Sequence, residues 1–258
     1  MRALERFVQT AHSSPRLPEA YYNLGFAYRQ LGRLEQAIAI WQRLVSDFPQ
    51  SDRRRDALRQ LGEVYLETDR PRQAIGAFQL WEQSAPTAEE RLWAAIGQAQ
   101  AYLELGNPAQ AEGVLRRTLN RARAEEQVTL QAELTLARAL EALGQTQEAE
   151  RLYIKVASSG YTELAAEAQF RLGLLYRRLG RLTQAVDVLE RVAVAFPGEL
   201  EWVVQARLEQ ARILRDIGNR LQAIRLYESI LRDYPGTQAA LEAARELAAL
   251  RGQGSPRR

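Results

Sequence analysis

The chain has 258 residues, of which 46% are hydrophobic and 26% charged, and its formal net charge is +3. It has no cysteine and a single histidine, His12, which excludes disulfide frameworks, cysteine nucleophiles, zinc–thiolate sites and metal sites built from histidine pairs. All but one of its 35 basic residues are arginine, the exception being Lys155, and the net charge is too small to indicate nucleic-acid binding by itself. No apolar run reaches the ~18 residues that a membrane-spanning helix needs.

An alanine that follows a turn recurs every 36 to 38 residues, at Ala37, Ala74, Ala111, Ala149, Ala185 and Ala223. Five residues before each alanine stands a glycine, or Asp69 in the second copy. Apolar residues precede each turn at helical spacing and follow it on one face of a second helix. Because a glycine just past a helical run supplies the left-handed residue that ends a helix, each copy is predicted to be a hairpin of two helices.

Each predicted hairpin pairs a small residue of its first helix with a large residue of its second. The small residue lies twelve positions before the alanine and the large one four positions after it, as in Gly25 with Trp41 and Gly62 with Phe78. Since small residues let two helices approach closely, we expect these large side chains in the core. Such a hairpin cannot bury its apolar face alone and must stack on its neighbours, which predicts an all-α solenoid of stacked antiparallel helix hairpins.

The pattern predicts one solenoid over residues 1–250. Its expected parts, in chain order, are a half unit at 1–15, hairpins at about 17–50, 54–87, 91–122, 129–160, 165–198 and 203–236, a capping helix at 237–250 and a disordered tail at 251–258. In the capping helix, Glu242, Arg245 and Glu246 are expected to face solvent.

The half unit follows from the register of the first hairpin. Ala3 and Phe7 stand 34 residues before Ala37 and Trp41, so the chain is expected to begin inside the second helix of a further unit. Two interpretations stay open at this point. The half unit is either a natural cap, since a solenoid needs atypical ends, or the start of a fragment of a longer protein.

Three copies carry a fuller set of aromatic, small and proline residues. In the first copy the set is Tyr21-x2-Leu24-Gly25-x2-Tyr28, followed by Ala37, Trp41, Leu44 and Pro49, and the copies that begin at Leu58 and Leu172 carry similar sets. These sets resemble the signature of the tetratricopeptide repeat (TPR) family, and the resemblance covers residues 17–235. The other copies are degenerate, with Gln98 and Gln210 at the usual leucine position. The resemblance implies a right-handed superhelix of about six TPR units.

The spacing of 36 to 38 residues is longer than the ~34 residues typical of the family. In this respect the chain is similar to the TPR proteins of bacterial envelopes. The first ten residues are charged and amphipathic, unlike a signal peptide, and there is no lipobox cysteine. We therefore expect a cytoplasmic location by default, and a periplasmic one if the chain is part of an envelope protein.

The resemblance also implies a binding groove lined by the first helices. In the family, groove-facing positions lie one, five, eight and nine residues after the first signature aromatic. Carried over to this chain, they give Tyr22, Phe26, Arg29, Gln30, Arg59, Glu63, Glu67, Arg138, Phe170, Arg177, Arg178, Arg212 and Arg215. The N-terminal part of this set is aromatic and mixed in charge, and the C-terminal part is rich in arginine. Because arginine presents a fork suited to carboxylates, an acidic peptide is one expected partner. The alternative is that an arginine-rich composition places arginine on every solvated face.

No Walker loop, dinucleotide-binding glycine pattern, Gly-x-Ser-x-Gly elbow or HExxH motif occurs. We therefore expect no catalytic residue, no cofactor and no metal. The leading hypothesis is a non-catalytic scaffold that binds a protein or peptide segment in its groove. A sensor or docking segment of a longer regulatory or envelope-assembly protein is the main alternative, and nucleic-acid binding through the arginine-rich groove is a weaker one. Self-association through exposed apolar residues of the last helix, or through an incomplete first hairpin, is left open.

Overall fold

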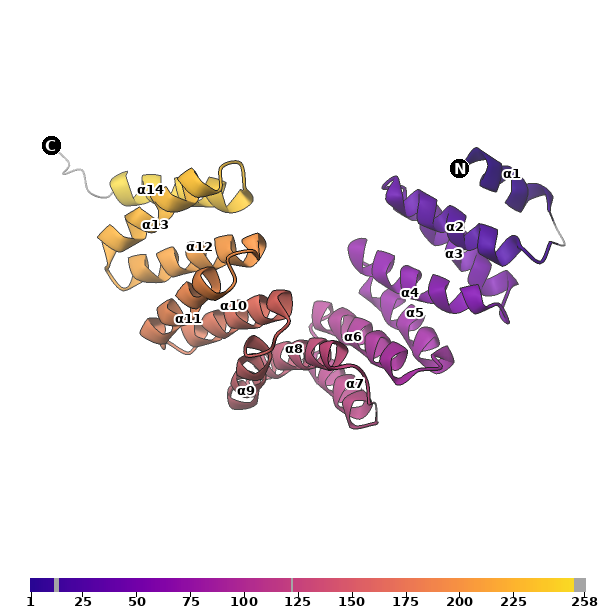
Figure 1. The fold of residues 1–258 in the computed structure, drawn as a ribbon, viewed down its shortest axis with the longest axis horizontal. Coiled ribbons are helices and arrows are strands. Elements are labelled where there is room, and N and C mark those ends of the chain that lie inside the picture. The colour runs from indigo at the N-terminus through magenta and orange to yellow at the C-terminus, as the bar shows by residue number, and fades with distance from the viewer. Residues whose placement is uncertain (12–13, 122, 253–258) are drawn as a thin grey trace. The chain divides into compact units, whose positions relative to one another are not determined.

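The computed structural model describes residues 1–11, 14–121 and 123–252 of the chain (Figure 1). The described residues form 14 α-helices and no strand, which confirms the all-α prediction. The helices are α1 (Arg2–Thr10), α2 (Leu17–Gln30), α3 (Leu34–Asp47), α4 (Asp52–Glu67), α5 (Pro71–Ser84), α6 (Ala88–Glu104), α7 (Pro108–Arg121), α8 (Glu126–Ala142), α9 (Thr146–Ala157), α10 (Thr162–Arg178), α11 (Leu182–Ala195), α12 (Leu200–Asp216), α13 (Arg220–Asp233) and α14 (Gln238–Gly252). His12 and residues 253–258 of the expected tail lie outside the described residues.

The helices belong to two compact units, Met1–Leu143 and Gly144–Arg258, which are described separately. In unit 1, α2 packs against α3, α4 against α5 and α6 against α7, and each second helix also packs against the first helix of the next hairpin. The first helices α2, α4, α6 and α8 contact one another in sequence order. In unit 2, consecutive helices from α9 to α14 pack in the same way, and α12 contacts both α10 and α14. The prediction of a single solenoid over 1–250 stays a prediction.

The turns inside the hairpins end the first helices as the glycine spacing predicts. Gly32 has a φ of 69°, and the amide of the next residue, Arg33, donates a hydrogen bond back to the carbonyl of Tyr28 at 2.9 Å. The second hairpin reaches the same geometry without glycine, because Asp69 adopts a φ of 56°. An L-residue with a side chain strains its backbone in this region, and a carboxylate at a helix C-terminus faces the negative end of the helix dipole.

We expect Asp69→Gly to raise the free energy of unfolding by about 1 kcal/mol, because glycine adopts the left-handed conformation without strain. Urea unfolding followed by circular dichroism measures the difference. The reciprocal change Gly32→Asp serves as the matched control and should lower stability. An Asp69→Gly chain that is no more stable than the wild type would show that the turn is unstrained.

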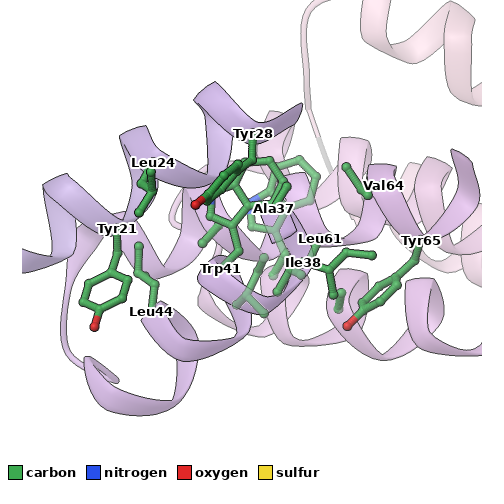
Figure 2. Packing of buried hydrophobic residues seen from close by; sticks show 14 of the residues in the cluster. Tyr21, Leu24, Tyr28, Ala37, Ile38, Trp41, Leu44, Leu61, Val64 and Tyr65 are labelled. Atoms are coloured by element: carbon green, nitrogen blue, oxygen red, sulfur yellow. The ribbon is translucent and has the colours of Figure 1, made fainter. Parts of the chain in front are cut away.

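The core of unit 1 is built from the predicted pairs of small and large residues. Trp41 of α3 is fully buried, and its ring lies against the backbone of Gly25 in α2, so closely that a Cβ atom at position 25 would overlap the indole. Figure 2 shows Trp41 among tyrosine, leucine and alanine side chains from α2, α3 and α4. Phe78 lies against Gly62 in the same manner. The prediction that these large side chains form the core is therefore confirmed.

The core of unit 2 contains a hydroxyl group that lacks a partner. Tyr227 of α13 is fully buried beside α12 and α14, and its hydroxyl makes no hydrogen bond among the described residues. Burial, helped by the negative charge of Glu246, raises the pKa of Tyr227 to about 12. Since a free tyrosine titrates near pH 10, the folded chain resists ionisation that the unfolded chain allows.

For Tyr227→Phe we expect a gain of about 1 kcal/mol in the free energy of unfolding at pH 7, because a buried hydroxyl without a partner costs stability. The raised pKa of Tyr227 adds to the free energy of unfolding of the wild type. This added stability is fully present below about pH 10 and is lost as pH rises towards about 12. The wild type should therefore lose stability over that range faster than the variant. Urea unfolding at pH 7 and pH 11 tests both parts. A variant that is less stable at pH 7 would mean that the hydroxyl is satisfied.

Candidate functional site

The first helices of unit 1 are joined by an arginine on α2. Nη1 of Arg29 donates hydrogen bonds to Oε1 of Gln60 at 2.6 Å and to Oε2 of Glu63 at 2.7 Å, and Nη2 pairs with Glu67. Burial lowers the pKa of Arg29, but the hydrogen bonds to the two glutamates outweigh it and hold the pKa above its ordinary value. The structure thus brings together three predicted groove residues, Arg29, Glu63 and Glu67, as an ion-pair cluster between α2 and α4.

Two aromatic residues of α2 were also predicted to line the groove. Tyr22 is half-buried, and the guanidinium carbon of Arg53 lies 5.1 Å from the centre of its ring. Burial raises the pKa of Tyr22, and the carboxylate of Asp56 adds to this effect. Phe26 is 44% exposed. The N-terminal first helix therefore presents accessible aromatic surface next to charged groups.

A pocket of about 320 Å³ opens between α4 and α6. The α4 side carries Arg59 and Glu63, and the rings of Phe78 and Trp81 from α5 also line it. The remaining residues come from α6 and are Trp93, Ile96, Gly97 and Gln100. Trp93 is 40% exposed, although tryptophan side chains are on average highly buried.

The α6 residues of this pocket were missed in the sequence analysis, although a signal for some of them was present. The family spacing, applied to the third hairpin, gives Ile96 and Gln100, because they lie one and five residues after Ala95 at the position of the signature aromatic. Trp93 falls outside that spacing. Its exposure could not be foreseen, since a tryptophan at helical spacing normally belongs to a core.

Arg138, also predicted for the groove, lies half-buried on α8 of unit 1. Burial, together with the negative charge of Asp69, raises the pKa of Glu104 on α6, and the positive charge of Arg138 only partly opposes this rise. The structure places Arg138 outside the lining of the α4–α6 pocket.

In unit 2, the predicted arginines form ion pairs with acidic residues of neighbouring helices. Arg177 of α10 pairs with Glu209 and, at 3.3 Å, with Asp216 of α12. Arg212 of α12 donates hydrogen bonds to Glu209 at 2.6 Å and to Glu242 of α14 at 2.7 Å. These pairs link three successive first helices.

The same network continues to the last helix. Arg215 pairs with Asp216 and with Glu246 of α14, and Glu246 also lies 3.6 Å from Arg212. Of the three residues that were expected to face solvent, Arg245 is exposed, whereas Glu242 and Glu246 are only partly exposed because their carboxylates bind arginines of α12. The sequence alone did not indicate these ion pairs, because the paired residues are 30 or more positions apart.

Two further predicted residues of unit 2 lie on α10. Phe170 packs against Trp202 of α12, with ring centres 5.6 Å apart and planes tilted by 39°. Arg178 lies exposed at the C-terminal end of the helix. Among the described residues, no group of three or more acidic or histidine side chains is arranged to hold a metal ion. None of the described helices is long and apolar enough to cross a membrane.

The repeated hairpins, their glycine turns and their small–large pairs agree with the comparisons with known proteins. Four family models, each described as a tetratricopeptide repeat, match residues 16–80, 92–117, 134–199 and 205–237. The chain belongs to the tetratricopeptide repeat family. No curated protein sequence matches this TPR chain.

Solved TPR structures share the fold. A TPR protein from Parabacteroides merdae has a TM-score of 0.69 at 17% sequence identity, covering 96% of this chain and 90% of that one. The Cut9–Hcn1 hetero-tetramer has a TM-score of 0.65 at 15% identity, with 96% of this chain and 45% of that chain covered. A Rap protein in complex with Competence and Sporulation Factor has a TM-score of 0.59 at 16% identity, with 97% and 79% covered. These likenesses confirm the predicted all-α repeat solenoid. TPR proteins generally act as scaffolds for protein–protein interactions.

Proposed function

We propose that this TPR protein is a non-catalytic scaffold that binds a peptide or protein segment on the first helices of its hairpins. The observation that carries the proposal is the pocket between α4 and α6. It exposes Trp93 next to the rings of Phe78 and Trp81, and large aromatic side chains in partly enclosed pockets are typical anchors of protein interfaces. Phe26 adds a second exposed aromatic residue on the same set of first helices.

The predicted groove arginines of unit 2 support this proposal less than Arg59 of unit 1, whose side chain is 51% exposed. Arg177, Arg212 and Arg215 already bind carboxylates of the chain itself, so an acidic partner segment would compete with Glu209, Glu242 and Glu246. A nucleic-acid backbone would meet the same competition. We therefore place the main binding surface on α4 and α6 of unit 1.

Two of the structural neighbours are complexes, Cut9 with Hcn1 and the Rap protein with Competence and Sporulation Factor. Other proteins with this fold thus bind partners. The proposal for this chain rests on its own exposed aromatic residues, because the neighbours share only 15% and 16% of their sequence with it.

The proposal is tested by affinity purification from the native host followed by quantitative mass spectrometry. The variant Phe26→Ser/Trp93→Gln removes both exposed aromatics from the first helices. The control Leu80→Gln/Leu221→Ser removes two exposed apolar residues from the second helices α5 and α13. We expect partners retained by the wild type and the control to fall at least ten-fold in the first variant. Equal recovery from both variants would place the binding surface elsewhere.

A further inference from the structure

Trp93 differs in kind from the residues at its position in the other hairpins. It lies eighteen residues before the alanine that follows the turn. The other five hairpins carry a polar or acidic residue there, namely Glu19, Asp56, Gln131, Glu167 and Gln205. Repeated units share their packing needs, so the hairpin fold does not require an aromatic residue at this position. The exposed tryptophan of α6 is therefore a feature of this one hairpin.

Gly97, four residues after Trp93, is a second departure. The other hairpins carry Asn23, Gln60, Thr135, Arg171 and Glu209 at this position. Glycine inside a helix costs about 1 kcal/mol relative to alanine, and here its missing side chain opens the pocket down to the ring of Phe78. A Cβ atom at position 97 would lie 2.6 Å from Cζ of Phe78. The depth of the pocket thus depends on this glycine.

Arg59, on the opposite side of the pocket, is a third departure. The other hairpins have apolar residues at its position, namely Tyr22, Ile96, Leu134, Phe170 and Leu208. The side chain of Arg59 is 51% exposed, and its Nε lies 3.4 Å from Oε1 of Glu63. The other oxygen of Glu63 accepts the shorter hydrogen bond from Arg29, so this carboxylate is shared between two guanidinium groups. Arg59 therefore keeps donors that a carboxylate from a partner could use.

A small polar hollow of about 100 Å³ adjoins the pocket and shares Arg59 and Trp81 with it. Arg55, Asp56 and Glu90 complete its lining. Asp56 accepts a hydrogen bond from Arg53 at 2.8 Å, and Arg55 lies 3.7 Å from Asp52, whose side chain is almost fully exposed. The lining of this hollow thus holds two arginines one helical turn apart and two carboxylates, of which Asp56 is already paired with Arg53.

We infer that the pocket between α4 and α6 receives a large apolar side chain of the partner and that Arg59, with Arg55, binds a carboxylate one or two residues away from it. The occupant is thus a protein segment in which Phe, Trp, Leu or Met stands next to Asp or Glu. The rings of Phe78, Trp81 and Trp93 favour the apolar side chain, and Arg59 disfavours a basic residue beside it. This inference rests on the proposed function and specifies the chemistry of the partner segment.

The test begins with selection of peptides that bind the full chain from a random display library. The enriched sequences should share a large apolar residue within two positions of Asp or Glu. A synthetic, fluorescein-labelled peptide of the enriched sequence then serves as the probe, and its dissociation constant is measured by fluorescence anisotropy. Enriched peptides that pair the apolar residue with Lys or Arg, or that lack an apolar residue, overturn the inference.

The variants Trp93→Gln and Arg59→Glu are expected to weaken binding of this peptide at least ten-fold. Glutamine already occupies the position of Trp93 in two other hairpins, so the helix tolerates it. Leu80→Gln is the matched control, because Leu80 on α5 is as exposed as Trp93, at 40%, and it should change binding less than two-fold. Circular dichroism establishes that each variant is folded.

The remaining outcomes separate this inference from the proposed function. If Trp93→Gln and Arg59→Glu leave binding unchanged while Phe26→Ser weakens it, the pocket inference is wrong and binding to the first helices stands. If no peptide is enriched, or if only Leu80→Gln weakens binding, both the inference and the proposed function are overturned.

Discussion

Trp41→Ala is expected to lower the free energy of unfolding by about 3–5 kcal/mol, the range typical of losing a large aromatic side chain from a core. Trp41 is fully buried, its ring fills the space left by Gly25, and its Nε1 donates a hydrogen bond to the carbonyl of Tyr22 at 3.1 Å. Urea unfolding followed by circular dichroism measures the loss.

The matched control changes the same residue type at the proposed binding site. Trp93→Ala should lower the free energy of unfolding by only about 1–2 kcal/mol, because Trp93 on α6 is 40% exposed and loses less buried apolar surface than Trp41. Similar losses for Trp41→Ala and Trp93→Ala would mean that Trp93 is a core residue. The argument that this tryptophan serves a partner would then fail.

Removal of the central arginine of unit 2 is expected to have the second largest effect. Arg212→Gln should lower the free energy of unfolding by about 2 kcal/mol, because it deletes charge-assisted hydrogen bonds to Glu209 and Glu242 and leaves these carboxylates close together. The three side chains are largely shielded from solvent, so screening by salt removes only part of the interaction. Thermal or urea unfolding at low and at high salt measures both effects.

Arg232→Gln is the control for this prediction. Arg232 is also paired, with its neighbour Asp233 at 2.9 Å, but its side chain is 73% exposed. An exposed ion pair contributes little, so the change should leave the free energy of unfolding nearly unaltered. Equal losses for the two arginine variants would contradict the assignment of the α10–α12–α14 network as a structural link.

The predictable part of this molecule is local in sequence. Helix periodicity and the glycine of each turn lie within a few residues of one another, and they indicate hairpins whose helices the structure places at Leu17–Gln30 and Leu34–Asp47 in the first copy. The pairing of Gly25 with Trp41 also spans only 16 residues within one hairpin. Such contacts are set by the hairpin itself and can therefore be deduced without coordinates.

The partnerships between hairpins could not be deduced in the same way. Arg177 pairs with Asp216, 39 residues further along, only because α10 and α12 lie side by side in one register. A shift of one helical turn would replace this pair by another. The sequence therefore predicted that the arginines of the C-terminal first helices bind a partner, whereas the structure shows several of them paired with carboxylates of the chain itself.

The pocket between α4 and α6 could be predicted from the sequence only in part. Each of Trp93, Gly97 and Arg59 departs from the residue type that the other hairpins carry at its position, and this comparison needs only the sequence. These three residues lie close together only because α4 packs beside α6, with the ring of Phe78 between Gly62 and Gly97. Sequence comparison between repeats thus flags the residues, and the fold shows that they share a pocket.

Site-specific photo-cross-linking tests the central claim most directly. Benzoylphenylalanine is placed at position 93 on α6 or, as the control, at position 80 on α5, and each chain is irradiated in complex with the partner purified from the native host. We predict cross-links from position 93 to a partner segment in which a large apolar residue stands next to an acidic one, and none from position 80. Cross-links from position 80 alone, or in equal yield from both positions, would contradict binding at the pocket between the first helices.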